Sequence, residues 1–118
     1  PGRALRRVHR LLRPGGGLAR AAPSASGISA RRSLAGFLER SPDDHVTVWP
    51  TGSAAGILGR LGFDLKRLEV TGHHPERFPG GGRLAAAGAA ARLIGGFSRL
   101  AGLGDTFEAY ALRREERR

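Results

Sequence analysis

The sequence predicts an α/β fold, because segments with helical periodicity alternate along the chain with segments of two-residue periodicity. Two observations support this prediction of the fold class. An arginine-faced amphipathic segment runs into a Pro-Gly-Gly turn near the start, and an apolar-polar alternation lies near the end. The expected order is helix, strand, helix, helix, strand, helix, strand. A length of 118 residues fits one small domain or part of a larger one.

The first expected helix spans residues 3–13, RALRRVHRLLR. At about 100° per residue, its aliphatic side chains fall on one stripe and its arginines on the opposite side. Pro14 forbids continuation of the helix, and the glycines at 15–17 form a tight turn. A short strand is expected at 18–22, ended by Pro23. No strand precedes this helix, so the α/β pattern lacks a first β element.

Two further helices are expected in the middle of the chain. Apolar residues at helical spacing between residues 28 and 40 predict one helix, which ends before Pro42. A second helix is expected at 52–61, with Thr51 as its N-cap and Gly62 as the glycine that follows its end.

Extended and irregular segments surround that second helix. Residues 46–49, VTVW, predict a brief extended segment. Residues 63–70 alternate in two halves with a slip at 66–67, which predicts a strand with a bulge. The breaker-rich segment 72–82 is expected to be a surface loop.

An Ala-rich helix is expected at 83–101, in which Leu93, Phe97 and Leu100 share one side. Gly95 and Gly96 each cost about 1 kcal/mol relative to Ala in a helix interior, so fraying or a break is expected near 95–96. A last strand is expected at 105–112, with Phe107, Ala109 and Ala111 on one face and Thr106, Glu108, Tyr110 and Leu112 on the other. Residues 113–118 form a charged tail.

The composition excludes several classes of protein. Without cysteine, the chain has no disulfide framework, thiol nucleophile or thiolate metal site. No stretch approaches the roughly 18 apolar residues of a membrane helix. No basic segment leads into an apolar core at the start, so no secretion signal is recognised and a cytoplasmic location is expected.

The charge is strongly positive, with 20 Lys plus Arg against 10 Asp plus Glu. Ala, Gly, Arg and Pro, which a GC-rich genome over-uses, make up 63 of the 118 residues, so we attribute much of the charge to codon bias. An Arg-rich module that binds RNA or an anionic surface is the alternative function. It is disfavoured because aromatic residues are not interleaved with the arginines, as base stacking requires.

Four segments, in chain order, resemble the carboxyl-terminal half of class I S-adenosylmethionine-dependent methyltransferases. Residues 4–16, ALRRVHRLLRPGG, resemble the helix and turn before the fifth strand, and 18–27 that strand and its loop. Residues 43–70 look like the next helix and sixth strand. Residues 104–114 are similar to the closing strand, which in this family lies antiparallel between the fifth and sixth. The resemblance implies a Rossmann-like sheet reduced to strands five to seven with flanking helices, its first half missing.

The resemblance implies that residues 1–118 form a single partial methyltransferase domain. The full protein would then transfer a methyl group from S-adenosylmethionine to an acceptor, expected to be a small molecule. The glycine-rich loop and the ribose-binding acid of the family have no counterpart here, so the cofactor would be held by the missing half. Pro1 as first residue suits a truncated start, and a non-enzymatic remnant remains the other interpretation. A half sheet leaves an uncovered edge, so self-association of the fragment is expected.

The resemblance also suggests site residues, each with a plainer alternative. His45 borders the family's acceptor pocket and is the candidate general base. Ser24, Asp44 and Trp49 are candidate substrate contacts. The alternatives are a solvated Asp-Asp-His turn and a buried core tryptophan. The segment 73–76 has metal-binding residue types, but its adjacent histidines point opposite ways in an extended loop, and no metal site is expected.

Overall fold

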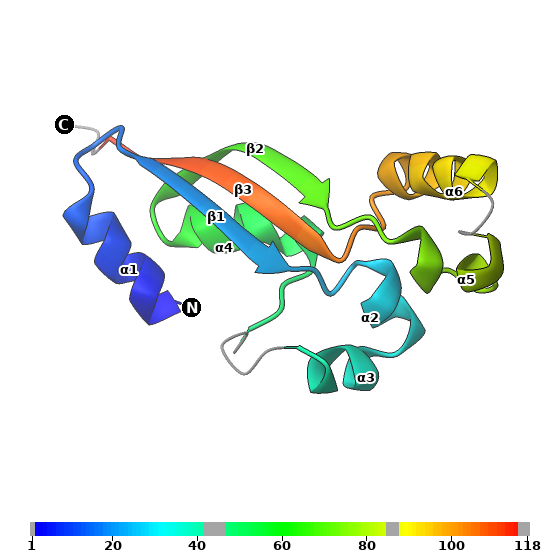
Figure 1. Ribbon diagram of the computed structural model, residues 1–118. Helices are drawn as coiled ribbons and strands as arrows, with labels where there is room; N and C mark the ends of the chain where they lie inside the picture. Colours follow the sequence, from blue (N-terminus) through cyan, green and yellow to red (C-terminus); the bar gives the residue numbers. More distant parts are fainter. Residues whose placement is uncertain (1, 42–46, 85–87, 116–118) are drawn as a thin grey trace.

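The computed structural model describes residues 2–41, 47–84 and 88–115 (Figure 1). The chain has an α/β fold around a three-stranded antiparallel sheet, formed by β1 Gly17–Pro23, β2 Phe63–Thr71 and β3 Thr106–Arg113. The strand order is β1-β3-β2, and β3 is antiparallel to both neighbours. The last strand of the chain therefore occupies the centre, and the two outer strands run parallel to each other.

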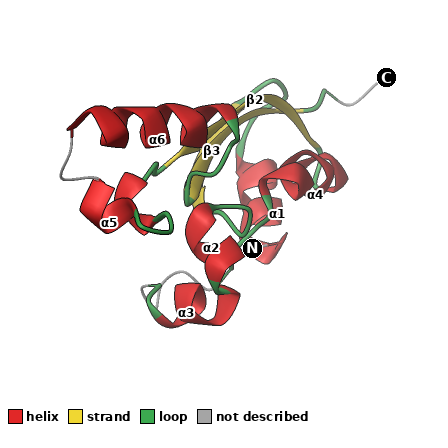
Figure 2. Ribbon diagram, turned by 90° about the vertical axis from the view of Figure 1, so that its right-hand side faces the viewer, coloured by secondary structure: helices red, strands yellow, loops and turns green. Residues whose placement is uncertain are grey.

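Helices and short turns precede and connect the strands in the predicted order, except that one predicted helix is divided in two and a short helix begins inside the predicted loop. They are α1 Gly2–Leu11, α2 Ile28–Arg32, α3 Leu34–Glu39, α4 Ala54–Arg60, α5 Gly81–Leu84 and α6 Gly88–Leu100, with 3₁₀ turns η1 Thr51–Ser53 and η2 Pro75–Arg77. Figure 2 shows α1 and α4 on the same side of the sheet, and Figure 1 shows α5 and α6 beyond the end of the sheet toward which β1 and β2 point.

The core lies between one face of the sheet and the helices α1 and α4. Phe63, Leu58 and Phe107 are fully buried in it, and Leu5 of α1 packs against the same cluster. The alternation predicted for the last strand is confirmed, because Phe107, Ala109 and Ala111 are buried while Tyr110 and Leu112 on the opposite face are 38% and 39% exposed. The arginine face predicted for the first helix is also confirmed, since Arg3, Arg6, Arg7 and Arg10 are exposed.

The turn after α4 and the bulge in β2 agree with what the sequence predicts. Gly62 has a φ of +84°, and a Cβ there would lie 2.5 Å from His9 Nε2, so both conformation and space require glycine. The register of β2 against β3 shifts between Leu65 and Arg67, as the slip in the alternation predicts.

The N-cap prediction for Thr51 is wrong. Thr51 lies inside η1, which begins after Pro50, and a hydrogen bond of 2.9 Å from Ser53 N to the Pro50 carbonyl closes this 3₁₀ turn. No side chain caps α4, and its first turn follows directly from η1. A nearby prediction holds in part: Trp49 forms a parallel bridge with Ser24, as an extended segment requires, whereas the start of that segment lies outside the described residues.

The helix predicted between residues 28 and 40 is divided in two. Ser33 adopts an extended backbone with φ of −161°, and its Oγ accepts a hydrogen bond from Gly36 N at 3.1 Å. Ser33 thus ends α2 and caps α3. The chain turns at this point, which places α2 and α3 around the cleft described below.

The segment 72–82 is more ordered than the predicted surface loop. It contains η2 and the start of α5, because Pro75 suits the first position of a tight turn. The predicted charged tail is also wrong at its start, since Arg113 still belongs to β3.

The helix α6 does not break at its glycines, contrary to the prediction, and its apolar stripe faces outward. Leu93, Phe97 and Leu100 are 76%, 58% and 92% exposed. The buried face instead carries Gly95, beside the Pro75 ring, and Ser98, whose Oγ lies 2.8 Å from His73 Nδ1. Small side chains let the helix approach this turn, which offsets the cost of glycine. Residues 85–87 of the predicted helix lie outside the described residues.

The molecule is elongated and its sheet has an open edge. The principal extents are 58 × 27 × 17 Å and the radius of gyration is 16.7 Å, against about 13–14 Å for a compact domain of this length. β1 is an edge strand, with β3 on one side. On its other side, the described residues form one bridge, between Ser24, directly after β1, and Trp49. No helix within the described ranges is long and apolar enough to cross a membrane.

We expect the isolated chain to self-associate. An unpaired strand edge is a template for pairing with another chain, and the outward stripe of α6 adds apolar surface. Sedimentation velocity should therefore show a dimer or larger species, and Leu93→Ser with Phe97→Ser should shift the distribution toward monomer. A single monomeric species that melts in one sharp two-state transition would contradict this expectation.

Candidate functional site

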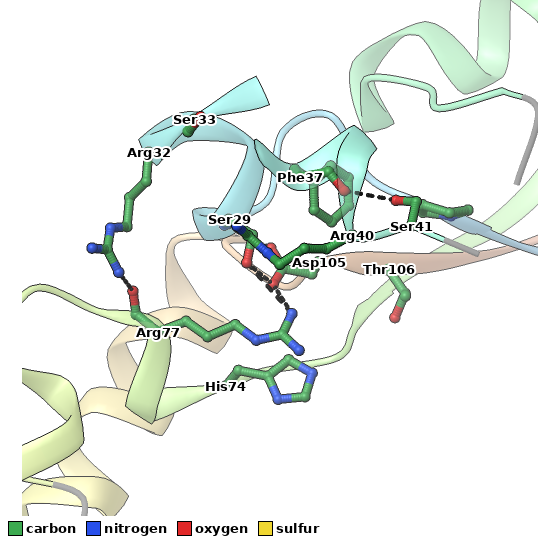
Figure 3. Close-up of a pocket in the computed structure, with 11 residues that line it drawn as sticks. Ser29, Arg32, Ser33, Phe37, Arg40, Ser41, His74, Arg77, Asp105 and Thr106 are labelled. Atoms are coloured by element: carbon green, nitrogen blue, oxygen red, sulfur yellow. Dashed lines mark hydrogen bonds and ion pairs between the residues drawn. The ribbon is translucent and has the colours of Figure 1, made fainter. Parts of the chain in front are cut away.

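A cleft of about 630 Å³ lies at the carboxyl ends of the two parallel strands, β1 and β2 (Figure 3). The helices α2 and α3 form one wall, and η2 with the start of β3 forms the other. The lining residues are Pro23, Ser29, Arg32, Ser33, Phe37, Arg40, Ser41, His74, Arg77, Asp105 and Thr106. Ligands of open α/β sheets bind outside the carboxyl ends of the strands, so this cleft is the candidate site.

Asp105 organises the inner end of the cleft. Its side chain is 3% exposed. Its Oδ1 accepts a hydrogen bond from Ser29 N at 2.8 Å, and its Oδ2 accepts one from Ser29 Oγ at 2.5 Å. Its backbone is also engaged, because Asp105 N donates to the Gly72 carbonyl and its own carbonyl accepts from Ser24 N. The residue therefore ties the start of β3 to α2 and to the end of β2.

The glycine before Asp105 explains how these segments meet. A Cβ on Gly104 would overlap the carbonyl oxygen of Thr71, so only glycine lets the chain enter β3 this close to the end of β2. The Gly-Asp pair at 104–105 thus fixes both the spacing of the backbone and the position of the carboxylate.

Arg77 completes the contacts of this carboxylate from the opposite wall. Its Nη1 donates to Asp105 Oδ2 at 2.6 Å and lies 3.4 Å from Ser29 Oγ. The Arg77 side chain is 42% exposed, and its carbonyl oxygen accepts a hydrogen bond from Arg32 Nη1 at 2.5 Å. η2 therefore links both walls of the cleft through side-chain and backbone contacts.

The remaining walls are cationic on one side and apolar on another. Arg32 and Arg40 line the cleft from the ends of α2 and α3, and Phe37 presents a ring to it (Figure 3). His74 Nδ1 lies 3.0 Å from Glu76 Oε1 at the rim. A backbone hydrogen bond, and then the His74 ring, hold the pKa of the Glu76 carboxyl below its usual range.

Two of the predicted substrate contacts, Ser24 and Trp49, lie in the interior rather than on the cleft wall. Ser24 is fully buried, and its Oγ accepts a hydrogen bond from Ser26 N at 3.1 Å. Trp49 is 4% exposed and packs near Phe107, with the Arg20 guanidinium 4.0 Å above its ring. Burial lowers the pKa of that guanidinium. The buried-core interpretation of Trp49 agrees with these contacts, and substrate contact by either residue stays a prediction.

The candidate base His45 and the predicted substrate contact Asp44 lie outside the described residues. They follow the cleft residue Ser41 in the sequence, with three residues between it and His45. Their roles stay predictions from the resemblance.

The two adjacent histidines have separate structural contacts. His73 Nδ1 lies 2.8 Å from Ser98 Oγ, and its Nε2 lies 3.0 Å from the Val70 carbonyl oxygen. His74 instead pairs with Glu76. Within the part of the chain that the structure describes, no three His, Asp or Glu side chains are placed to hold a metal ion.

The described residues do not fit S-adenosylmethionine. The glycines at 15–17 follow α1 and precede β1, the reverse of a nucleotide-binding loop. The glycines at 80–82 span the start of α5, but a Cβ on Gly81 would overlap the Pro75 carbonyl oxygen, so this glycine packs α5 onto η2. The acid Asp105 already accepts hydrogen bonds from Ser29 and Arg77 and is only 3% exposed, so it is not placed as a ribose-binding acid.

The sequence did not single out the residues that form the cleft. Ser29, Asp105 and Arg77 come from separate parts of the chain, and no motif joins them. The one local signal was the Gly-Asp pair at 104–105, directly before a strongly alternating strand. Comparison of the chain with protein-family models finds no match, and comparison with curated proteins finds none either.

Proposed function

We propose that this chain forms the acceptor-side part of a class I S-adenosylmethionine-dependent methyltransferase domain, and that its cleft receives a small-molecule acceptor. The observation that carries the proposal is the strand order β1-β3-β2, with β3 antiparallel between two parallel strands. The same arrangement of fifth, seventh and sixth strands belongs to the family that the sequence resembles. The position of the cleft at the carboxyl ends of β1 and β2 supports it further.

In this proposal the residues of the chain bind and orient the acceptor. The donor methyl group would be supplied by the cofactor bound to the other part of the protein. Catalysis of methyl transfer by such a site depends mainly on positioning, because holding two reactants in line removes much of the entropic barrier. Phe37 and the arginines of the cleft are the described side chains available for this task.

Methyl transfer by the full-length gene product tests the proposal. The protein is incubated with methyl-labelled S-adenosylmethionine and a panel of small hydroxylated aromatic acids, and label in the acceptors is counted. Phe37→Ala should raise the KM for the acceptor and leave the KM for the cofactor unchanged. Leu34→Ala is the matched control, because Leu34 lies on the same helix, is 50% exposed and does not line the cleft. Absence of both transfer and cofactor binding would overturn the proposal.

The isolated 118 residues should not bind S-adenosylmethionine measurably. Among the described residues, the glycine run after β2, at 80–82, packs α5 onto η2, and no acid at the end of a strand is free. Calorimetry should therefore show no dissociation constant tighter than about 100 μM, roughly −5.5 kcal/mol. The full-length gene product serves as the positive control. Binding by the isolated chain would contradict the acceptor-side assignment.

A further inference from the structure

The cleft carries an unbalanced positive charge. Among its lining residues are three arginines and a single carboxylate, that of Asp105. Arg77 neutralises this carboxylate through the contact at 2.6 Å. Among the described residues, Arg32 donates to the neutral Arg77 carbonyl and makes no ion pair, and Arg40 makes no ion pair either. Two guanidinium charges therefore face the cleft without a balancing acid in the described part of the chain.

The hydroxyl groups of the cleft already have partners inside the protein. Ser33 Oγ accepts from Gly36 N, Ser41 Oγ donates to the Phe37 carbonyl at 2.9 Å, and Thr106 Oγ1 lies 2.7 Å from Thr71 Oγ1. A guanidinium has five N–H donors, and Arg32 uses one of them in the contact described above. The hydrogen-bonding capacity left to a ligand is thus mostly that of cationic donors, which match carboxylate or phosphate oxygens.

The size and the apolar wall of the cleft restrict the ligand further. A volume of about 630 Å³ falls within the range of small-molecule sites. The half-buried ring of Phe37 offers a flat apolar surface in the cleft that Arg32 and Arg40 also line. A ligand with a planar apolar body and an anionic group would use both features.

We propose that the cleft binds a small molecule in which a carboxylate or phosphate is attached to a flat apolar body, and that Arg32 and Arg40 bind the anionic group. This inference rests on the proposed function only where it equates that ligand with the methyl acceptor. Anion binding itself requires no cofactor and no methyl transfer.

Binding of benzoate and phenyl phosphate to the 118-residue chain tests the inference, with benzamide as the neutral analogue. Amide chemical shifts should move at Gly36, Ser33 and Thr106 for the anions and not for benzamide. Replacing Arg32 and Arg40 together by Gln should weaken binding at least tenfold, about 1.4 kcal/mol. Replacing Arg3 and Arg7 by Gln is the matched control, since it removes the same charge from the exposed face of α1.

The outcomes distinguish binding of the anions in the cleft from non-specific attraction to the positive charge of the whole protein. Equal weakening by the two double variants, equal binding of benzamide, or displacement of the anions by a generic RNA at about 0.15 M salt would overturn the inference. Tighter binding of benzoate than phenyl phosphate identifies a carboxylate site, and the reverse a phosphate site. Inorganic phosphate that binds as tightly as phenyl phosphate would contradict the role of Phe37. Should the cleft variant unfold, the comparison of benzoate with benzamide on the unmodified chain still decides.

The result also separates the two proposals. Anion binding without methyl transfer by the full-length gene product would overturn the methyltransferase assignment and leave the anion site in place. Methyl transfer to neutral acceptors, with no anion binding, would support the assignment and overturn this inference.

Discussion

Replacing Phe107 with alanine should lower the free energy of unfolding by about 3–5 kcal/mol, the cost of truncating a fully buried aromatic residue. Phe107 is 0% exposed, lies on the central strand and packs near the Trp49 ring, with 6.4 Å between ring centroids. It stands opposite Ala22 in β1 and Val70 in β2. Alanine would leave a cavity that the small neighbour Ala22 cannot fill. Urea denaturation of wild type and variant at one protein concentration measures the change.

A matched truncation on the surface controls this experiment. Leu100 of α6 is 92% exposed, so Leu100→Ala should change the free energy of unfolding by about 0.5 kcal/mol or less. Similar losses for both variants would mean that Phe107 is not the centre of the core. The description of the sheet would then be wrong.

The central strand was predictable because its signal is local. The alternation from Thr106 to Leu112 assigns every second residue to one face, and a strand in the middle of a sheet buries that face whatever surrounds it. The helix α1 and the glycine after α4 were predictable for the same reason. In each case neighbouring residues alone determine both the conformation and the face that packs.

In the helix α6, the local sequence does not determine which side of the helix packs against the rest of the protein. Helical periodicity established that Leu93, Phe97 and Leu100 share a side, and this is correct. It does not determine which side packs. The partner of α6 is a turn at Pro75 and His73, which Gly95 and Ser98 can approach closely. Of the apolar stripe, Phe97 makes an edge contact with the Phe78 ring, with 6.4 Å between centroids, and the stripe as a whole stays largely exposed.

The cleft could not be predicted because its contacts are long-range. Ser29 and Asp105 are separated by 76 positions, and Arg77 reaches Asp105 across 28. Each residue also has an ordinary local interpretation. Ser29 would be read as part of a helix start, Asp105 as an acidic residue in a turn, and Arg77 as a solvated arginine. The resemblance directed attention to the carboxyl end of β1, where the candidate cleft lies. It assigned the contacts to Ser24 and Trp49, whose side chains lie in the interior beneath it.

Replacing Asp105 with alanine should lower the free energy of unfolding by about 2–4 kcal/mol, because it leaves buried donors without an acceptor. Ser29 N and Ser29 Oγ would both lose their bond to the carboxylate, and Arg77 would lose its counterion. Asp105→Asn should cost less, since an amide oxygen still accepts from Ser29 N. Asp64→Ala is the matched control. Asp64 pairs with Arg114 at 2.6 Å, and both side chains are about half exposed, so its loss should leave stability nearly unchanged.

The stabilities of the three variants distinguish two roles of the Asp105 carboxylate. It could accept hydrogen bonds from Ser29, or it could act only as the negative charge opposite Arg77. If Asp105 acts by accepting hydrogen bonds from Ser29, the order of stability is wild type, Asp105→Asn, Asp105→Ala, and the Asn variant retains the shifts that benzoate causes at Ser33 and Gly36. If only the charge opposite Arg77 matters, Asn and Ala cost the same. Equal stability of Asp105→Ala and Asp64→Ala would mean that neither role holds and that the two walls of the cleft are joined by other contacts.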